Sequence, residues 1–125
     1  MLTRTLEILR TATCGNRFLD FQLAEAIGYQ RGTHVVSGGE RVLVWTLPNG
    51  RDVRQNEIPE FTSSIDSARL LAEIVDCNHV AAVVSDQKGA RAVICDGLPA
   101  YATTPALALC LATLMLYRAK TDIAP

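Results

Sequence analysis

The feature that most constrains the fold of this chain is an apolar segment near its end, residues 106–117. Thr113 is the one polar side chain among these twelve residues. Thr104 and Pro105 stand directly before the segment. This pair favours a helix start, because threonine caps free amides and proline fits the first helical position. A membrane-spanning helix needs about 20 apolar residues. The segment therefore predicts a helix that is buried in the protein.

The apolar side chains of this helix point in nearly every direction. A helix in a small domain normally has an apolar stripe of about 100° and a polar back. One flank of this helix must then be covered, either by the N-terminal helices of the same chain or by a second copy of the chain. We expect a homodimer, with an interface formed by Leu107, Leu111, Leu114 and Met115.

Three further segments have helical periodicity, and three have the composition of strands. The helical segments are residues 2–12, 17–27 and 63–76, and the strand segments are residues 41–47, 79–84 and 91–95. The polar stretch 86–89 joins the last two strands as a hairpin. We therefore expect a small, mainly antiparallel sheet with helices packed on it, an α/β fold of the α+β type. A three-layer α/β/α sandwich is one such arrangement.

A chain of 125 residues has room for one domain with its own core. Within this single domain, 1–125, we assign residues 1–16 to an extra N-terminal helix, 17–120 to a sandwich-like core and 121–125 to a tail. Residues 51–59 are polar and irregular. They predict a surface loop with one short edge strand at Val53.

Charge and composition argue against several classes of function. The net charge of −1 at pH 7 is too small for a protein that binds nucleic acid by neutralising phosphates. Glu7 lies where a signal peptide would need an unbroken apolar core. We therefore expect a cytoplasmic protein with neither a nucleic acid nor a membrane as its partner.

The four cysteines are far apart, and no two of them form a C-x-x-C unit. They are Cys14, Cys77, Cys95 and Cys110. Each lies in or beside an apolar run, which is typical of free cysteines that pack as small hydrophobic residues. The alternative is a soft-metal or nucleophile cluster of Cys77, Cys95 and His79. We expect buried structural cysteines, no bound metal and no cofactor.

Catalytic motifs are missing from the sequence, which contains neither G-x-S-x-G nor a glycine-rich phosphate loop. We therefore predict that the protein is not an enzyme. One candidate ligand site consists of Trp45 with Arg41, Arg51 and Arg54. An indole ring can stack a base and guanidinium groups can hold a phosphate, as in a small-nucleotide pocket. The other interpretation is a core tryptophan beside solvated arginines.

Three segments follow a recognisable pattern. Residues 19–29, LDFQLAEAIGY, resemble LD-x-x-(L/V)-A-E-x-(L/M)-G-W, with Ile27 at the leucine or methionine position and Tyr29 in place of the tryptophan. Residues 59–68, PEFTSSIDSA, match P-x-(Y/F)-(S/T)-x-(D/S)-I-x-x-A, and residues 102–110, ATTPALALC, match A-x-T-P-A-L-A-(I/L)-C. In order and spacing the chain resembles the phage ABA sandwich domain family of small phage and prophage proteins.

This resemblance implies an α/β sandwich encoded by a phage or prophage, and it implies no known activity. The family pattern does not cover residues 31–56. We expect a phage accessory protein that acts by non-catalytic binding to a host protein, such as a component of a host defence system, in the cytoplasm of the host cell. The alternative is a small-nucleotide-binding module that sequesters a signal.

Overall fold

The computed structural model describes residues 2–75, 81–94 and 98–122. The helices in these ranges are α1 (Leu2–Thr11), α2 (Arg17–Ala26), α3 (Ile65–Val75) and α4 (Pro105–Asp122). Sheet A consists of β1 (Gln30–Val35), β2 (Arg41–Thr46) and β3 (Asp52–Arg54). Sheet B consists of β4 (Ala81–Asp86), β5 (Gly89–Ile94) and β6 (Ala100–Ala102). The strands in both sheets pair in the antiparallel sense.

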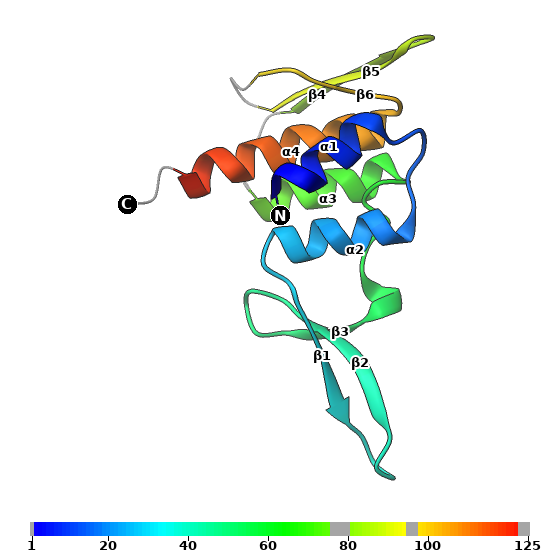
Figure 1. Ribbon diagram of the computed structural model, residues 1–125, viewed down its shortest axis with the longest axis vertical. Helices are drawn as coiled ribbons and strands as arrows, with labels where there is room; N and C mark the ends of the chain where they lie inside the picture. Colours follow the sequence, from blue (N-terminus) through cyan, green and yellow to red (C-terminus); the bar gives the residue numbers. More distant parts are fainter. Residues whose placement is uncertain (1, 76–80, 95–97, 123–125) are drawn as a thin grey trace.

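The helices lie between the two sheets (Figure 1). Sheet B packs on α4, and sheet A extends away from the helices on the side of α2. The expected α+β fold, with antiparallel strands and helix–sheet packing, is confirmed. The described residues form two separate sheets at opposite ends of a helical layer, and not one sheet between helices. The reason is that α3 carries the chain across the helical layer between β3 and β4.

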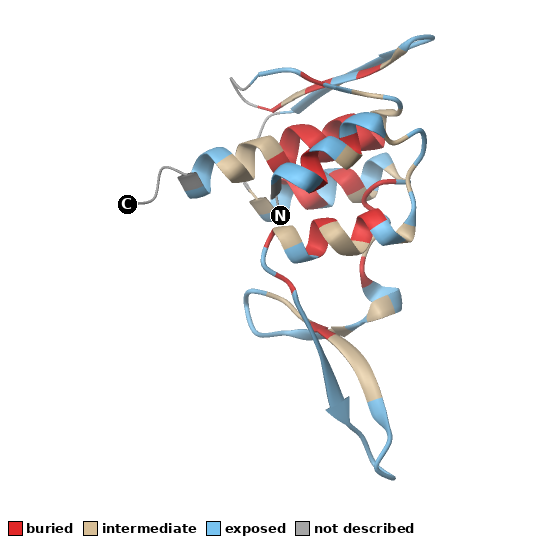
Figure 2. Cartoon of the chain, viewed as in Figure 1, coloured by how far each residue is buried: buried red, intermediate tan, exposed pale blue. Residues whose placement is uncertain are grey.

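Helix α4 is the centre of the core. It contacts α1, α3 and all three strands of sheet B, and Figure 2 shows that most of its first part is buried. Leu107, Leu111 and Leu114 are at most 1% exposed, and Met115 is half-buried. The expected interface is therefore wrong for the three leucines, because the same chain already covers them. The oligomeric state itself stays a prediction.

The local signals of α4 are as predicted from the sequence. The Leu107 amide donates to the Thr104 hydroxyl at 3.2 Å, which caps the helix. The hydroxyl of the buried Thr113 donates to the Leu109 carbonyl at 2.8 Å, so its polar group is satisfied within the helix. In the described part of the chain, no helix has the length and hydropathy to cross a membrane.

Three boundaries differ from those predicted. Helix α1 belongs to the core, because Leu6 and Leu9 are buried and the helix packs on α4. Helix α4 extends to Asp122, two residues into the segment assigned as a tail, and residues 123–125 lie outside the described ranges. Helix α3 begins at Ile65, two residues after the predicted start at residue 63, and Ser64 caps it, because its hydroxyl accepts from the Ser67 amide at 3.4 Å.

Two strands were not predicted from the sequence. Strand β1 is exposed at all six positions, so its sequence has no apolar alternation to reveal it, and it contains Gly32. Strand β6 has three residues, which is too short for a pattern. The short edge strand around Val53 and the hairpin of β4 and β5 are confirmed.

Candidate functional site

Trp45 on β2 is a core residue. Its side chain is 0% exposed, and its ring stacks on Phe21 of α2 with a centroid distance of 5.6 Å. The guanidinium carbon of Arg31 lies 5.7 Å from the centroid of the indole ring. The indole Nε1 is buried and has no hydrogen-bond partner among the described residues. No part of the ring is left for a ligand base, so the structure agrees with a core tryptophan.

The three arginines expected around Trp45 do not converge on it, and all three are exposed. Arg41 lies four positions away on β2, about 13 Å along a strand. Arg54 projects from the other face of sheet A, because it pairs with the residue before Trp45. Arg51 lies outside β2 and β3, in the connection between them. The arginine that reaches the ring is Arg31, directly opposite Trp45 on the unpredicted strand β1.

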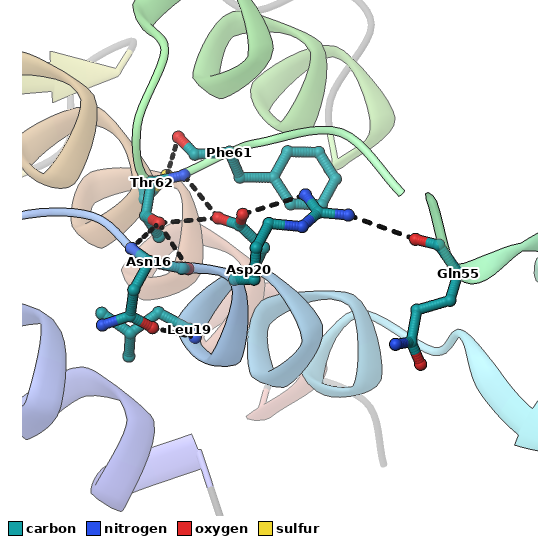
Figure 3. Close-up of polar contacts among 8 residues, drawn as sticks. Asn16, Leu19, Asp20, Gln55, Phe61 and Thr62 are labelled. Carbon is teal, nitrogen blue, oxygen red and sulfur yellow. Dashed lines mark hydrogen bonds and ion pairs between the residues drawn. The ribbon is translucent and has the colours of Figure 1, made fainter. Parts of the chain in front are cut away.

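Asp20 forms a buried polar junction between α2 and the segment before α3 (Figure 3). Its carboxylate accepts hydrogen bonds from the Thr62 amide at 2.8 Å and from the Thr62 hydroxyl at 2.6 Å. Arg17 donates to the other carboxylate oxygen at 3.1 Å and to the Gln55 carbonyl at 3.1 Å. Both carboxylate oxygens therefore have partners within the chain. This arrangement ties three segments together, and we assign it a structural role.

Cys110 of α4 is a buried structural cysteine, as expected. Its thiol donates to the Phe61 carbonyl at 3.1 Å. Burial, followed by the negative charge of Asp20, raises the pKa of this thiol far above its usual range. A neutral thiol is a weak nucleophile. Cys14 differs from the expectation because it is exposed in the connection between α1 and α2.

The alternative cluster of Cys77, Cys95 and His79 lies outside the described residues. Among the residues that the structure does describe, no group of three or more His, Cys, Asp and Glu side chains could hold a metal ion. His34 on β1 lies 3.3 Å from the Asp52 carboxylate. That carboxylate also accepts a hydrogen bond from the Thr46 hydroxyl at 2.7 Å. These contacts connect the three strands of sheet A on one face.

The outer face of sheet B presents a line of exposed side chains. Arg91 on β5 lies opposite Val84 on β4 and opposite Tyr101 on β6. Residues directly opposite one another project from the same face of a sheet, so these three side chains stand together. We call them the sheet B row. Val84 is 56% exposed and Tyr101 is 62% exposed, and Arg91 is also exposed.

A shallow hollow of about 370 Å³ accompanies the sheet B row, and Asp86 and Lys88 also line it. With Arg91, these two residues give the surface a formal charge of +1. Arg91 makes no ion pair within the described ranges. Enclosed clefts bury most of a small ligand, whereas this hollow lies on the face of a sheet. Its open shape therefore suits contact with a protein surface better than the binding of a small molecule.

The sheet B row was not predicted from the sequence, although a signal for it existed. Along β5, Ala90, Ala92 and Ile94 are buried, and Arg91 between them is exposed. This alternation is typical of a strand with one face on the core and the other in solvent. The row itself needs the strand register, which the sequence does not provide.

No family model, no curated protein and no solved structure matches this chain. The resemblance to the phage ABA sandwich domain family therefore stays an expectation.

Proposed function

We propose that this protein works by binding another protein, without catalysis, through the sheet B row. In a phage or prophage, the setting that the resemblance implies, the partner is a host protein such as a defence component. The single observation that carries the proposal is the exposed row of Val84, Arg91 and Tyr101 across one open sheet face.

The composition of the row supports this proposal. Tyrosine and arginine are, with tryptophan, the residues most enriched among those that dominate the binding energy of protein interfaces. Arg91 has no intramolecular ion pair among the described residues, so a carboxylate on the partner can pair with it without breaking an existing contact. Val84 and Tyr101 on either side of it would bury apolar area. The partner surface is therefore expected to carry an acidic side chain flanked by apolar ones.

Affinity capture with matched variants tests the proposal. The wild-type chain, Arg91→Glu and Arg69→Glu are each immobilised and exposed to extract of the source cell. Arg69 is exposed on α3 and is not part of sheet B, so Arg69→Glu controls for the change in charge. A partner should be retained by the wild type and by Arg69→Glu. Arg91→Glu should reduce the binding free energy by about 2 kcal/mol, as is typical of a hot-spot residue, and raise the Kd roughly thirtyfold.

Two outcomes would contradict the proposal. Equal retention of every bound protein by all three forms would show that the sheet B row is not the binding surface. Turnover of a substrate by the purified chain, with no partner that depends on Arg91, would show that the protein is an enzyme.

A further inference from the structure

Strand β1 is a free edge of sheet A. Its pairing partner in the described structure is β2, and its other side faces solvent. Proteins usually protect an edge strand of this length with a proline, a lysine or a bulge. Residues 30–35 contain neither proline nor lysine, and their register with β2 is continuous. The guanidinium of Arg31 is directed toward the body, 3.5 Å from Glu25 of α2, so it does not block the edge.

The hydrogen bonds of sheet A show which backbone groups of β1 are open. At the hairpin end, the Val36 amide donates to the Glu40 carbonyl at 2.9 Å. Hydrogen-bonded pairs alternate along an antiparallel ladder, so the even-numbered residues of β1 bond to β2. The backbone groups that face the free edge belong to Arg31, Thr33 and Val35. Three amide donors and three carbonyl acceptors are therefore available to another strand.

Nothing within the chain requires a glycine at position 32, in the middle of β1. A Cβ added there would meet nothing within 4 Å, and its φ is not positive. Glycine weakens a strand, and where it persists it often marks a bulge, a bend or the close approach of another backbone. The continuous register excludes a bulge. Of the two explanations left, a bend or the close approach of another chain, the second also accounts for the open edge of β1.

The sequence of β1 is complementary to itself when two copies run antiparallel. A two-fold axis at Thr33 pairs the whole strand and places each residue opposite a compatible one. Thr33 then faces Thr33 of the second copy, and Arg31 faces Val35, so no like charges are directly opposed. Gly32 faces His34 of the second copy in a non-hydrogen-bonded pair, where side chains are closest. The missing side chain at Gly32 leaves room for that imidazole.

From the free edge, the unexplained glycine and this register, we infer that two copies of the chain pair through β1 about a two-fold axis at Thr33. The two copies of sheet A then form one continuous antiparallel sheet. This contact lies at the opposite end of the molecule from the sheet B row (Figure 1), so it does not depend on the proposed function. A strand from a different protein is the competing occupant of this edge.

Sedimentation equilibrium of the full chain tests the inference. The mass should rise from 13.6 kDa toward twice that value as the concentration increases from low micromolar to near millimolar. Thr33→Pro removes one amide that faces the free edge and leaves the hydrogen bonds to β2 intact, which edge strands tolerate. This variant should stay monomeric. Thr33→Val keeps the amide, and it should dimerise as the wild type does.

Charged substitutions at Thr33 test the proposed register between the two copies without introducing a proline. Thr33→Arg or Thr33→Glu alone places like charges opposite each other and should raise the Kd of the dimer roughly fivefold. An equimolar mixture of the two variants should recover the dimer, because opposite charges then face each other. A wild type that stays monomeric, whether or not other proteins bind the edge, would overturn the inference. A dimer that is unchanged in folded Thr33→Pro and in both charge variants would also overturn it.

Discussion

Gly15 and Asp20 hold the segment before α3 against the start of α2. A Cβ added to Gly15 would overlap the backbone of Thr62, and the Asp20 carboxylate accepts hydrogen bonds from both the amide and the hydroxyl of Thr62. The sequence puts Asp20 in the first turn of the helix expected at residues 17–27, where negative charge is favourable. It could not identify Thr62 as the partner, because the two residues are 42 positions apart and only tertiary packing brings them together.

The Asp20 junction is expected to contribute strongly to stability. Asp20→Ala should lower the free energy of unfolding by about 3 kcal/mol, because it leaves the buried Thr62 amide without an acceptor and removes the ion pair with Arg17. Asp20→Asn retains one oxygen acceptor and should cost about half as much. Urea unfolding followed by circular dichroism measures both changes.

The matched control for this junction is Asp66→Asn. Asp66 is also an aspartate in the first turn of a helix, but it is exposed. Its replacement should change the free energy of unfolding by no more than about 0.5 kcal/mol. An effect of Asp20→Ala no larger than that of Asp66→Asn would mean that the junction does not stabilise the fold.

At the scale of elements, α4 and β1 mark the limits of prediction from sequence. A long apolar segment with a threonine cap and a proline at its start can form only a buried helix, so α4 was predictable. The segment that covers α4 was not predictable, because a helix with apolar residues on all sides can pack against its own chain or against a second copy. Strand β1 has no buried face, so its sequence contains no period that reveals a strand.

The burial of α4 predicts opposite outcomes for glutamate substitutions at two of its leucines. Leu111 is 1% exposed, so Leu111→Glu places an unpaired charge in the core and should cost about 4 kcal/mol or more. That is close to the whole stability of a domain at the lower end of the typical range of about 5 to 15 kcal/mol, and the chain should unfold. Leu116 is half-buried beside the open end of α4, so Leu116→Glu should leave a folded protein. A folded, monomeric Leu111→Glu would instead support an interface at this helix.

At the scale of the whole molecule, burial is concentrated in the helical layer and decreases toward sheet A. Figure 2 shows buried residues mainly in the helices and exposed residues along most of β1 and the tip of the hairpin. Trp45 fixes the base of sheet A to Phe21 of α2, whereas residues 31–40 are all exposed. The sequence predicted the existence of a core and its main helix. It could not predict that two sheets lie at opposite ends, because strand order depends on contacts between distant segments.

Amide hydrogen exchange, measured by NMR in dilute solution where the chain is monomeric, should follow this distribution of burial. Amides of residues 107–114 lie in the centre of the core, so they should exchange only through global unfolding and be protected roughly 10³-fold or more. In β1, the amides of Gly32 and His34 should be moderately protected by their bonds to β2, whereas those of Arg31, Thr33 and Val35 should exchange nearly as fast as in an unfolded peptide.

Raising the concentration should then slow exchange at Thr33 and its two neighbours on the free edge, because the second copy binds those amides. Uniform exchange along β1 would contradict the deduced hydrogen-bond pattern. Protection at Thr33 that does not change with concentration would show that its amide already has a partner within the chain.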